Sequence, residues 1–149
     1  MASFNFKLEK VLNYKEIVEN EKKNKFAQIK QRLYKEEALL DDYYKEKKSI
    51  IEKRNAFNKK IKAGELFLYN LYIDTINKKI EKQKLIVLNI MKELDQAKNE
   101  MVNAVKDKKI LEKLKENKYE EFIYEQGKEE EKLIDNLVSY KTATRIRGM

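Results

Sequence analysis

The stretch KKIKAGELF, residues 59–67, decides the fold of this chain, because it holds the only glycine among the first 126 residues. The whole sequence of 149 residues contains three glycines and no proline, so it offers few places at which a helix can end. Gly64 suits the left-handed residue that closes many helices, and the lysines before it suit the carbonyl end. We therefore predict a turn at about residues 63–65, with Glu65 at the positive start of the next helix.

Apolar residues on both sides of this turn recur at alternating spacings of four and three, which is the pattern of a coiled-coil seam. Polar residues interrupt the first seam at Lys15, Glu19 and Lys22, so we expect weak packing there. The first seam begins at Leu8 and runs through Leu12, Phe26, Ile29, Leu33, Leu40, Tyr43, Ile50, Phe57, Ile61, Leu68 and Leu71. The second runs through Ile73, Ile76, Ile80, Gln83, Val87, Ile90, Leu94, Ala97, Met101, Ala104 and Leu111, and resumes after a phase slip at Tyr119, Ile123, Leu133, Leu137 and Tyr140.

Two such seams joined by one turn predict an all-α fold in which two long helices form an antiparallel coiled-coil hairpin. The expected helices span about residues 6–62 and 65–140 of a single domain covering residues 1–149, and the tail at 141–149 is expected to fray. The alternative is one long helix that bends through Gly64, which would leave both seams in need of a partner chain.

The composition excludes most catalytic chemistry. The sequence has no cysteine and no histidine, so it lacks thiol nucleophiles, imidazole bases and the usual zinc ligands. Its scattered glycines cannot form a phosphate-binding loop. A hairpin of two helices also offers no cleft that would desolvate a carboxylate pair. We therefore expect no enzymatic activity, no cofactor and no metal site.

Two further expectations concern location and charge. The densest apolar run, Leu85–Met91, is too short to span a bilayer, and the N-terminus lacks the apolar core of a signal peptide, which favours a cytoplasmic protein. The net charge of +8 leaves nucleic-acid binding open as a different class of function, although the basic residues are interleaved with acidic ones. The segment Glu120–Asp135 is acidic, and we expect it to project beyond the N-terminus as a solvated face or a partner contact.

Four blocks of the sequence, in order, resemble the flagellar export proteins of the FliJ family. The opening FxFxLxxVLxxK is present as Phe4, Phe6, Leu8, Val11, Leu12 and Lys15. The block YxxYIxxI, extended to a glutamine, is present as Tyr69, Tyr72, Ile73, Ile76, Ile80 and Gln83. The third block, LEKLKExxYxxF, covers residues 111–122, and an acidic ending covers residues 125–135. Asn117 and Asn136 depart from the family pattern.

The resemblance implies a helical stalk in the flagellar type III protein export apparatus, similar to the central stalk of rotary ATPases. It implies three partners: a hexameric export ATPase, the cytoplasmic domain of the membrane export gate, and export chaperones. The protein would lie in the cytoplasm, peripherally associated with the membrane at the flagellar base. An equivalent stalk of a virulence-type secretion system or of a rotary ATPase is the alternative within the same class.

The resemblance also implies two sets of partner-binding residues. Contacts with the export gate are expected at Tyr69, Tyr72, Ile73, Ile76 and Gln83. Contacts with the ATPase ring are expected at Phe4, Phe6, Leu8, Leu12, Lys15, Leu111, Leu114, Tyr119 and Phe122. Aromatic residues in coiled coils often only fill the seam, so a packing role remains the alternative for each of these rings.

Overall fold

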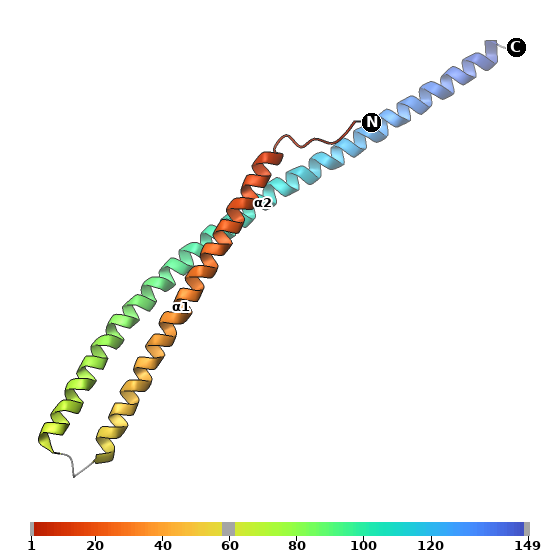
Figure 1. Cartoon of the computed structure of the whole chain (residues 1–149). Helices are drawn as coiled ribbons and strands as arrows, with labels where there is room; N and C mark the ends of the chain where they lie inside the picture. Colours follow the sequence, from red (N-terminus) through yellow and green to blue (C-terminus); the bar gives the residue numbers. More distant parts are fainter. Residues whose placement is uncertain (1, 58–61, 148–149) are drawn as a thin grey trace. The chain divides into compact units, whose positions relative to one another are not determined.

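The computed structural model describes residues 2–57 and 62–147 of the chain. Two α-helices account for almost all of them: α1 (Glu9–Phe57) and α2 (Ala63–Arg147) (Figure 1). The helices pack against each other as a hairpin, and neither described range contains a strand. The predicted all-α hairpin fold is confirmed.

Contacts between residues divide the chain into two compact units. The turn unit, Asn20–Asn103, contains most of α1 and the first part of α2. The end unit combines Met1–Glu19 with Ala104–Met149. Each unit therefore consists of one segment from the first half of the chain packed on one segment from the second.

The turn unit is held together by the two predicted seams. Its central cluster joins Ile29 and Leu33 of α1 to Val87, Ile90 and Ala97 of α2. Ile76 is 1% exposed and Ile80 is 3% exposed, so the α2 seam is buried along much of this unit. Every α2 position predicted for the seam from Ile73 to Leu111 is buried or half-buried. The apolar residues of α2 therefore form the face that packs on α1, as the spacing predicted.

The end unit has a smaller core. Phe6, Leu12 and Ala104 are its buried apolar residues. From Gly127 to Arg145 every side chain of α2 is exposed, and Figure 1 shows this part of the helix continuing beyond the N-terminal segment. The predicted seam positions Leu133, Leu137 and Tyr140 are consequently exposed, and the earlier positions Tyr119 and Ile123 are about half exposed.

The polar interruption of the first seam is bridged by ion pairs to α2. In the end unit Lys15 Nζ lies 3.7 Å from Asp107 Oδ2, and Lys108 Nζ lies 3.2 Å from the buried Glu19. The hydrogen bond to Glu19 raises the pKa of Lys108, which keeps the lysine charged.

The turn unit repeats this arrangement with a single carboxylate. Lys22 and Lys25 lie 3.2 Å and 3.4 Å from the same Glu100 oxygen. The hydrogen bond from Lys22, followed by the nearby positive charges, lowers the pKa of Glu100. The weak stretch predicted from the sequence is therefore a stretch of ionic contacts across the two helices.

The ends of the helices differ from the prediction. α1 begins at Glu9 rather than at Phe6, because residues 2–6 are not helical and the Glu9 amide donates a 3.1 Å hydrogen bond to the Phe6 carbonyl. α2 continues through Arg147 instead of fraying after Tyr140. The hydroxyls of Thr142 and Thr144 bond back to carbonyls one turn earlier, and neither glycine nor proline precedes Gly148 in this tail.

The prediction for Gly64 is wrong. Gly64 lies in the first turn of α2, with helical backbone, and does not close α1 in a left-handed conformation. α1 ends at Phe57 among the described residues, and the predicted capping residues Lys59 and Lys60 and the predicted seam position Ile61 lie outside them. Glu65 does lie in the first turn of α2, as predicted.

Leu68 and Leu71 also differ from the prediction. Both were expected on the first seam, but they are 63% and 52% exposed. The reason is that α2 already begins at Ala63, so these leucines belong to the second helix. Its inward face at this point carries Tyr69, Ile73 and Ile76 instead.

Gly64→Ala tests whether Gly64 has a helical or a left-handed backbone, because the change in the free energy of unfolding has opposite signs in the two cases. A Cβ added at Gly64 meets no atom within 4 Å, so alanine at a helical position should raise the free energy of unfolding by a few tenths to about 1 kcal/mol. A left-handed residue would give a loss of similar size. Chemical denaturation followed by circular dichroism measures the change, and Gly127→Ala, also helical and open, is the matched control.

Candidate functional site

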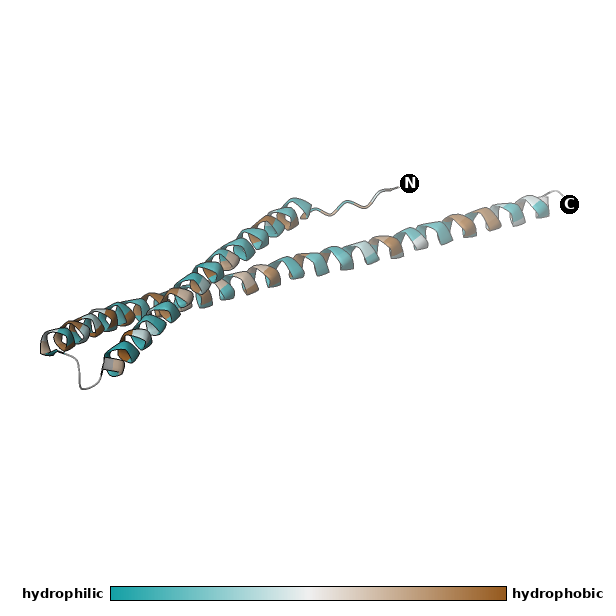
Figure 2. Ribbon diagram, turned by 60° about the horizontal axis from the view of Figure 1, so that its bottom comes forward, coloured by the Kyte–Doolittle hydropathy of each residue, from teal (hydrophilic) through white to brown (hydrophobic). Residues whose placement is uncertain are grey.

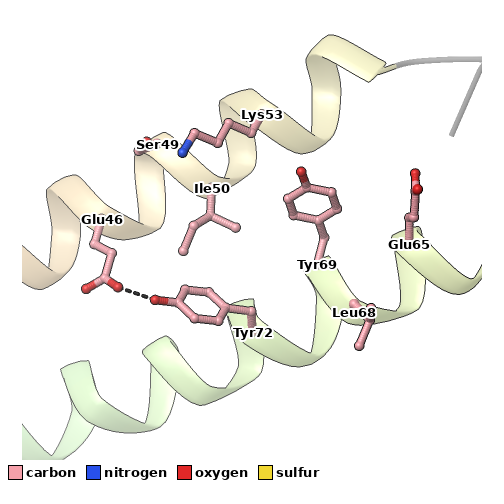
Figure 3. A pocket seen from close by; sticks show the side chains of 8 residues that line it. All are labelled: Glu46, Ser49, Ile50, Lys53, Glu65, Leu68, Tyr69 and Tyr72. Carbon is pink, nitrogen blue, oxygen red and sulfur yellow. Dashed lines mark hydrogen bonds between the residues drawn. The ribbon is translucent and has the colours of Figure 1, made fainter.

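A cleft of about 740 Å³ lies between α1 and α2 in the turn unit, close to the start of α2. Tyr69 and Tyr72 extend from α2 toward α1 (Figure 3). The other residues that line the cleft carry apolar, charged and hydroxyl side chains: Glu46, Ser49, Ile50, Lys53, Glu65 and Leu68. Two of the residues expected at the gate site therefore line the same cleft.

Tyr72 is held in place at one edge of this cleft. Its hydroxyl donates a hydrogen bond to the Glu46 carboxylate of α1 (Figure 3). This hydrogen bond, together with the negative charge of Glu46, raises the pKa of Tyr72. The ring is still 47% exposed, so a fixed and accessible aromatic surface results. Fixed aromatic rings lose little side-chain entropy when a partner covers them.

Further apolar side chains are exposed on the first turns of α2, close to Tyr72 in the sequence. Phe67, Leu68 and Leu71 are each more than half exposed, and Leu66 is 38% exposed. Such a concentration of exposed apolar residues is typical of a protein-binding surface. The sequence blocks did not include these residues, and Leu68 and Leu71 were expected on the first seam instead.

The other three residues expected at the gate site are buried. Ile73 and Ile76 belong to the interface between the helices, at 9% and 1% exposure. Gln83 is 4% exposed, and its side-chain amide donates to the Glu36 backbone carbonyl at 3.0 Å and to the Glu36 carboxylate. These residues support the cleft and the hairpin from inside.

The residues expected at the ATPase ring all fall in the end unit. Phe4 packs on α2, with its ring centroid 5.3 Å from that of Tyr119 and 5.6 Å from that of Phe122. Phe6 and Leu12 are buried, Leu111 and Leu114 are half-buried, and Lys15 pairs with Asp107. Leu8 and Tyr119 are 39% and 49% exposed.

A second cleft, of about 560 Å³, borders this aromatic cluster. Residues 3–8 form one wall, and the other is formed by Leu114, Lys118, Glu121, Phe122 and Glu125 of α2. Glu9 and Lys115 join the two segments through an ion pair with an N–O distance of 2.9 Å. The N-terminal segment therefore folds onto α2 through rings and charges together.

Two wider searches of the described residues bear on other kinds of site. Among residues 2–57 and 62–147, histidine, cysteine, aspartate and glutamate form no group of three that could hold a metal ion. Within the same ranges, neither helix contains an apolar stretch long enough to cross a membrane.

Gln83→Ala should destabilise the hairpin. It removes a buried side chain and both hydrogen bonds to Glu36, so the free energy of unfolding should fall by about 1–3 kcal/mol. Asn89→Ala, at an exposed position of α2 in the same unit, should change it by less than about 0.5 kcal/mol. Urea denaturation measures both. A Gln83→Ala protein as stable as wild type would show that the buried amide contributes no net stability.

Comparison with known proteins identifies the family. A family model described as "Flagellar FliJ protein" matches residues 4–147, which is nearly the whole chain. Neither a curated protein nor a solved structure gives a significant match. The match includes both clefts and both helices. The chain therefore belongs to the FliJ family and is a component of the flagellar protein export apparatus.

Proposed function

We propose that this chain is the helical stalk that couples the hexameric export ATPase to the cytoplasmic domain of the membrane export gate during flagellum assembly. It also contacts export chaperones, and it works in the cytoplasm at the inner face of the membrane. The chain itself catalyses no reaction; it stimulates hydrolysis by its partner. The observation that carries the proposal is that the residues expected at the ATPase ring all lie in the end unit, whereas Tyr69 and Tyr72 of the gate set line the cleft of the turn unit.

The cleft of the turn unit supports the gate contact. It offers one fixed tyrosine, Tyr72, together with the exposed Leu68, and Phe67 and Leu71 are exposed on the same turns of α2. A partner loop or helix with apolar residues could cover this surface and bury area comparable to the centre of a small interface. The charged residues Glu46, Lys53 and Glu65 at the same cleft would set the orientation of that partner.

The aromatic cluster of the end unit supports the ATPase contact. The Phe4 ring joins the N-terminal segment to α2, so both chain segments present one combined surface. Around it lie charged residues of both signs, including Glu9, Lys115, Lys118 and Glu121. A surface of this mixed kind can bind inside a ring without the strong adhesion of a large apolar patch.

Nucleic-acid binding is a weaker candidate. Several lysines and arginines pair with carboxylates of the opposite helix, as Arg32 does with Glu93 and Lys115 with Glu9. Paired cations release fewer counterions from a phosphate backbone than free ones. The structure offers no observation that favours this candidate over the export role.

Tyr72→Ala should weaken binding to the isolated cytoplasmic domain of the export gate by about tenfold, because it removes the exposed ring at the edge of the cleft. Isothermal titration calorimetry measures the affinity. Tyr34→Ala is the matched control, since Tyr34 is an exposed tyrosine of the same unit outside the cleft. Tyr72→Phe keeps the ring but loses its hydrogen bond to Glu46, so its affinity should lie between those of wild type and Tyr72→Ala. Equal affinity of the Tyr72→Ala and Tyr34→Ala proteins would contradict the gate site.

Phe4→Ala should reduce stimulation of the export ATPase, because the N-terminal segment loses its ring contacts with Tyr119 and Phe122. We expect at least about a threefold loss of the stimulated rate in a phosphate-release assay. Tyr14→Ala, at a 60% exposed position of α1 in the same unit, should stimulate normally. Full stimulation by the Phe4→Ala protein would exclude the cluster from the ATPase contact.

A further inference from the structure

The end unit contains a buried charge that the proposed function does not use. Glu19 of α1 is 6% exposed and lies on the first seam, at a position of the kind that apolar residues occupy elsewhere along α1. Lys108 Nζ of α2 lies 3.2 Å from the Glu19 carboxylate and 3.6 Å from the carboxylate of Glu112. A carboxylate and an ammonium group therefore meet in the interface between the helices, where the turn unit has side chains such as Ile29 and Val87.

This ion pair weakens the packing in which it takes part. Removal of two charges from water costs free energy that their attraction returns only in part, so apolar residues at the same positions often pack as well or better. Loss of one member costs more than loss of both, because the other charge then stays in the interface without its partner. Glu19 and Lys108 therefore hold α1 in the end unit less firmly than a pair of leucines would.

Little other apolar packing holds this part of α1. We call residues 2–19 the N-terminal arm. The buried apolar residues of the end unit are Phe6, Leu12 and Ala104, and only the first two belong to the arm. The turn unit, in contrast, buries a longer series of apolar residues: Ile29, Leu33, Ile50, Ile73, Ile76, Ile80, Val87, Ile90 and Ala97.

The arm also contacts α2 through partly exposed ion pairs. The charged atoms of Glu9 and Lys115 lie 2.9 Å apart and those of Lys15 and Asp107 lie 3.7 Å apart, and each of these side chains is at least 33% exposed. Ion pairs of this kind contribute little net stability. The contacts of the arm are therefore few in their apolar part and weak in their ionic part.

α2 remains a helix where no residue of the end unit covers it. It continues through Arg147, although every side chain from Gly127 to Arg145 is exposed. Figure 2 shows hydrophobic residues recurring between hydrophilic ones along this part of α2. Separation of the arm would therefore leave α2 helical. Residues 9–19 of the arm are fewer than the roughly 12–15 that an isolated helix needs in water, so the arm would lose its helix once separated.

We propose that the N-terminal arm separates from α2 as one unit in the free chain, while the turn unit stays packed, and that the pair of Glu19 and Lys108 sets how often this happens. Separation uncovers Leu114 and Phe122 of α2, which line the second cleft together with residues 3–8. The inference concerns the chain without any partner, so it does not depend on the proposed ATPase contact.

A purely structural role is the competing explanation for the ion pair. Polar residues at seam positions can fix the register of two helices without any opening. The arm would then stay docked as firmly as the rest of the hairpin, and its amides would exchange only by gradual fraying from the N-terminus. The two explanations predict different patterns of protection along α1.

Native-state hydrogen exchange of the full chain, followed by NMR, measures the separation. The amides of residues 13–19 should share one opening free energy, and protection should rise abruptly after Asn20. Their exchange should be at least about a hundredfold faster than that of α2 amides in residues 73–97. A gradual increase of protection from residue to residue, or equal protection in both stretches, overturns the proposal.

Two variants test the role of the ion pair. Glu19→Leu with Lys108→Leu places an apolar pair in the interface and should slow exchange of residues 13–19 at least about tenfold. Lys108→Leu alone leaves the Glu19 carboxylate in the interface and should speed this exchange by a similar factor. Asp41→Ala with Lys45→Ala removes an exposed ion pair within α1 of the turn unit and, as the matched control, should leave the rate unchanged. An unchanged rate in the double-leucine protein contradicts the proposal.

Single cysteines test the separation independently, since the chain contains none. Leu12→Cys places a thiol at a position that is 8% exposed, so the thiol should react with a labelling reagent only when the arm is separated. Addition of Glu19→Leu and Lys108→Leu should slow this reaction at least about tenfold. Asn13→Cys, at the exposed neighbouring position, should react equally fast in both backgrounds. Equal rates for Leu12→Cys with and without the leucine pair would also overturn the proposal.

Discussion

Burial of one apolar face on each helix is the interaction on which the rest of this structure depends. Long helices of Lys, Glu and Leu are marginal in water by themselves, and packing of an amphipathic face supplies most of their stability. Here that packing consists of a single layer of side chains, with Ile76, Ile80 and Ala97 almost completely buried. No third layer exists in the described residues, so each remaining face stays in contact with water and carries the high charge of the chain.

The seam changes character where its apolar residues give way to Lys15, Glu19 and Lys22. Ion pairs with Asp107, Lys108 and Glu100 replace apolar contacts there, and those pairs that are partly exposed contribute little net stability. The division of the chain into two units falls in the same stretch, at Glu19–Asn20 and Asn103–Ala104. The ionic stretch therefore coincides with the boundary between the two units.

Most of the fold could be predicted from the sequence, because a hairpin of two helices is specified by periodicity. The buried face of each helix could be predicted from the spacing of its apolar residues, because burial in a helix pair recurs with the same period as those residues. The turn was misplaced because Gly64 was assigned from the general preference of glycine for helix ends. The start of α1 was misplaced because Phe4 and Phe6 give the same apolar signal in a helix or in an extended segment. The pairing of Tyr72 with Glu46 depends on the register between the helices, and no local pattern reports that register.

The unequal lengths of the helices determine where further partners must bind. α1 has 49 residues and α2 has 85, so a seam that runs along the whole of α2 cannot be covered within the chain. Its exposed part, within residues 127–145, alternates Leu133, Leu137 and Tyr140 with Glu130 and Thr144, whereas the covered part near Ile76 and Ile80 is almost entirely apolar. Polar residues at seam positions lower the free-energy cost of exposing that face to water, and they also weaken any helix pair formed there. A stripe of this composition therefore suits a surface that is covered for part of the time and exposed for the rest.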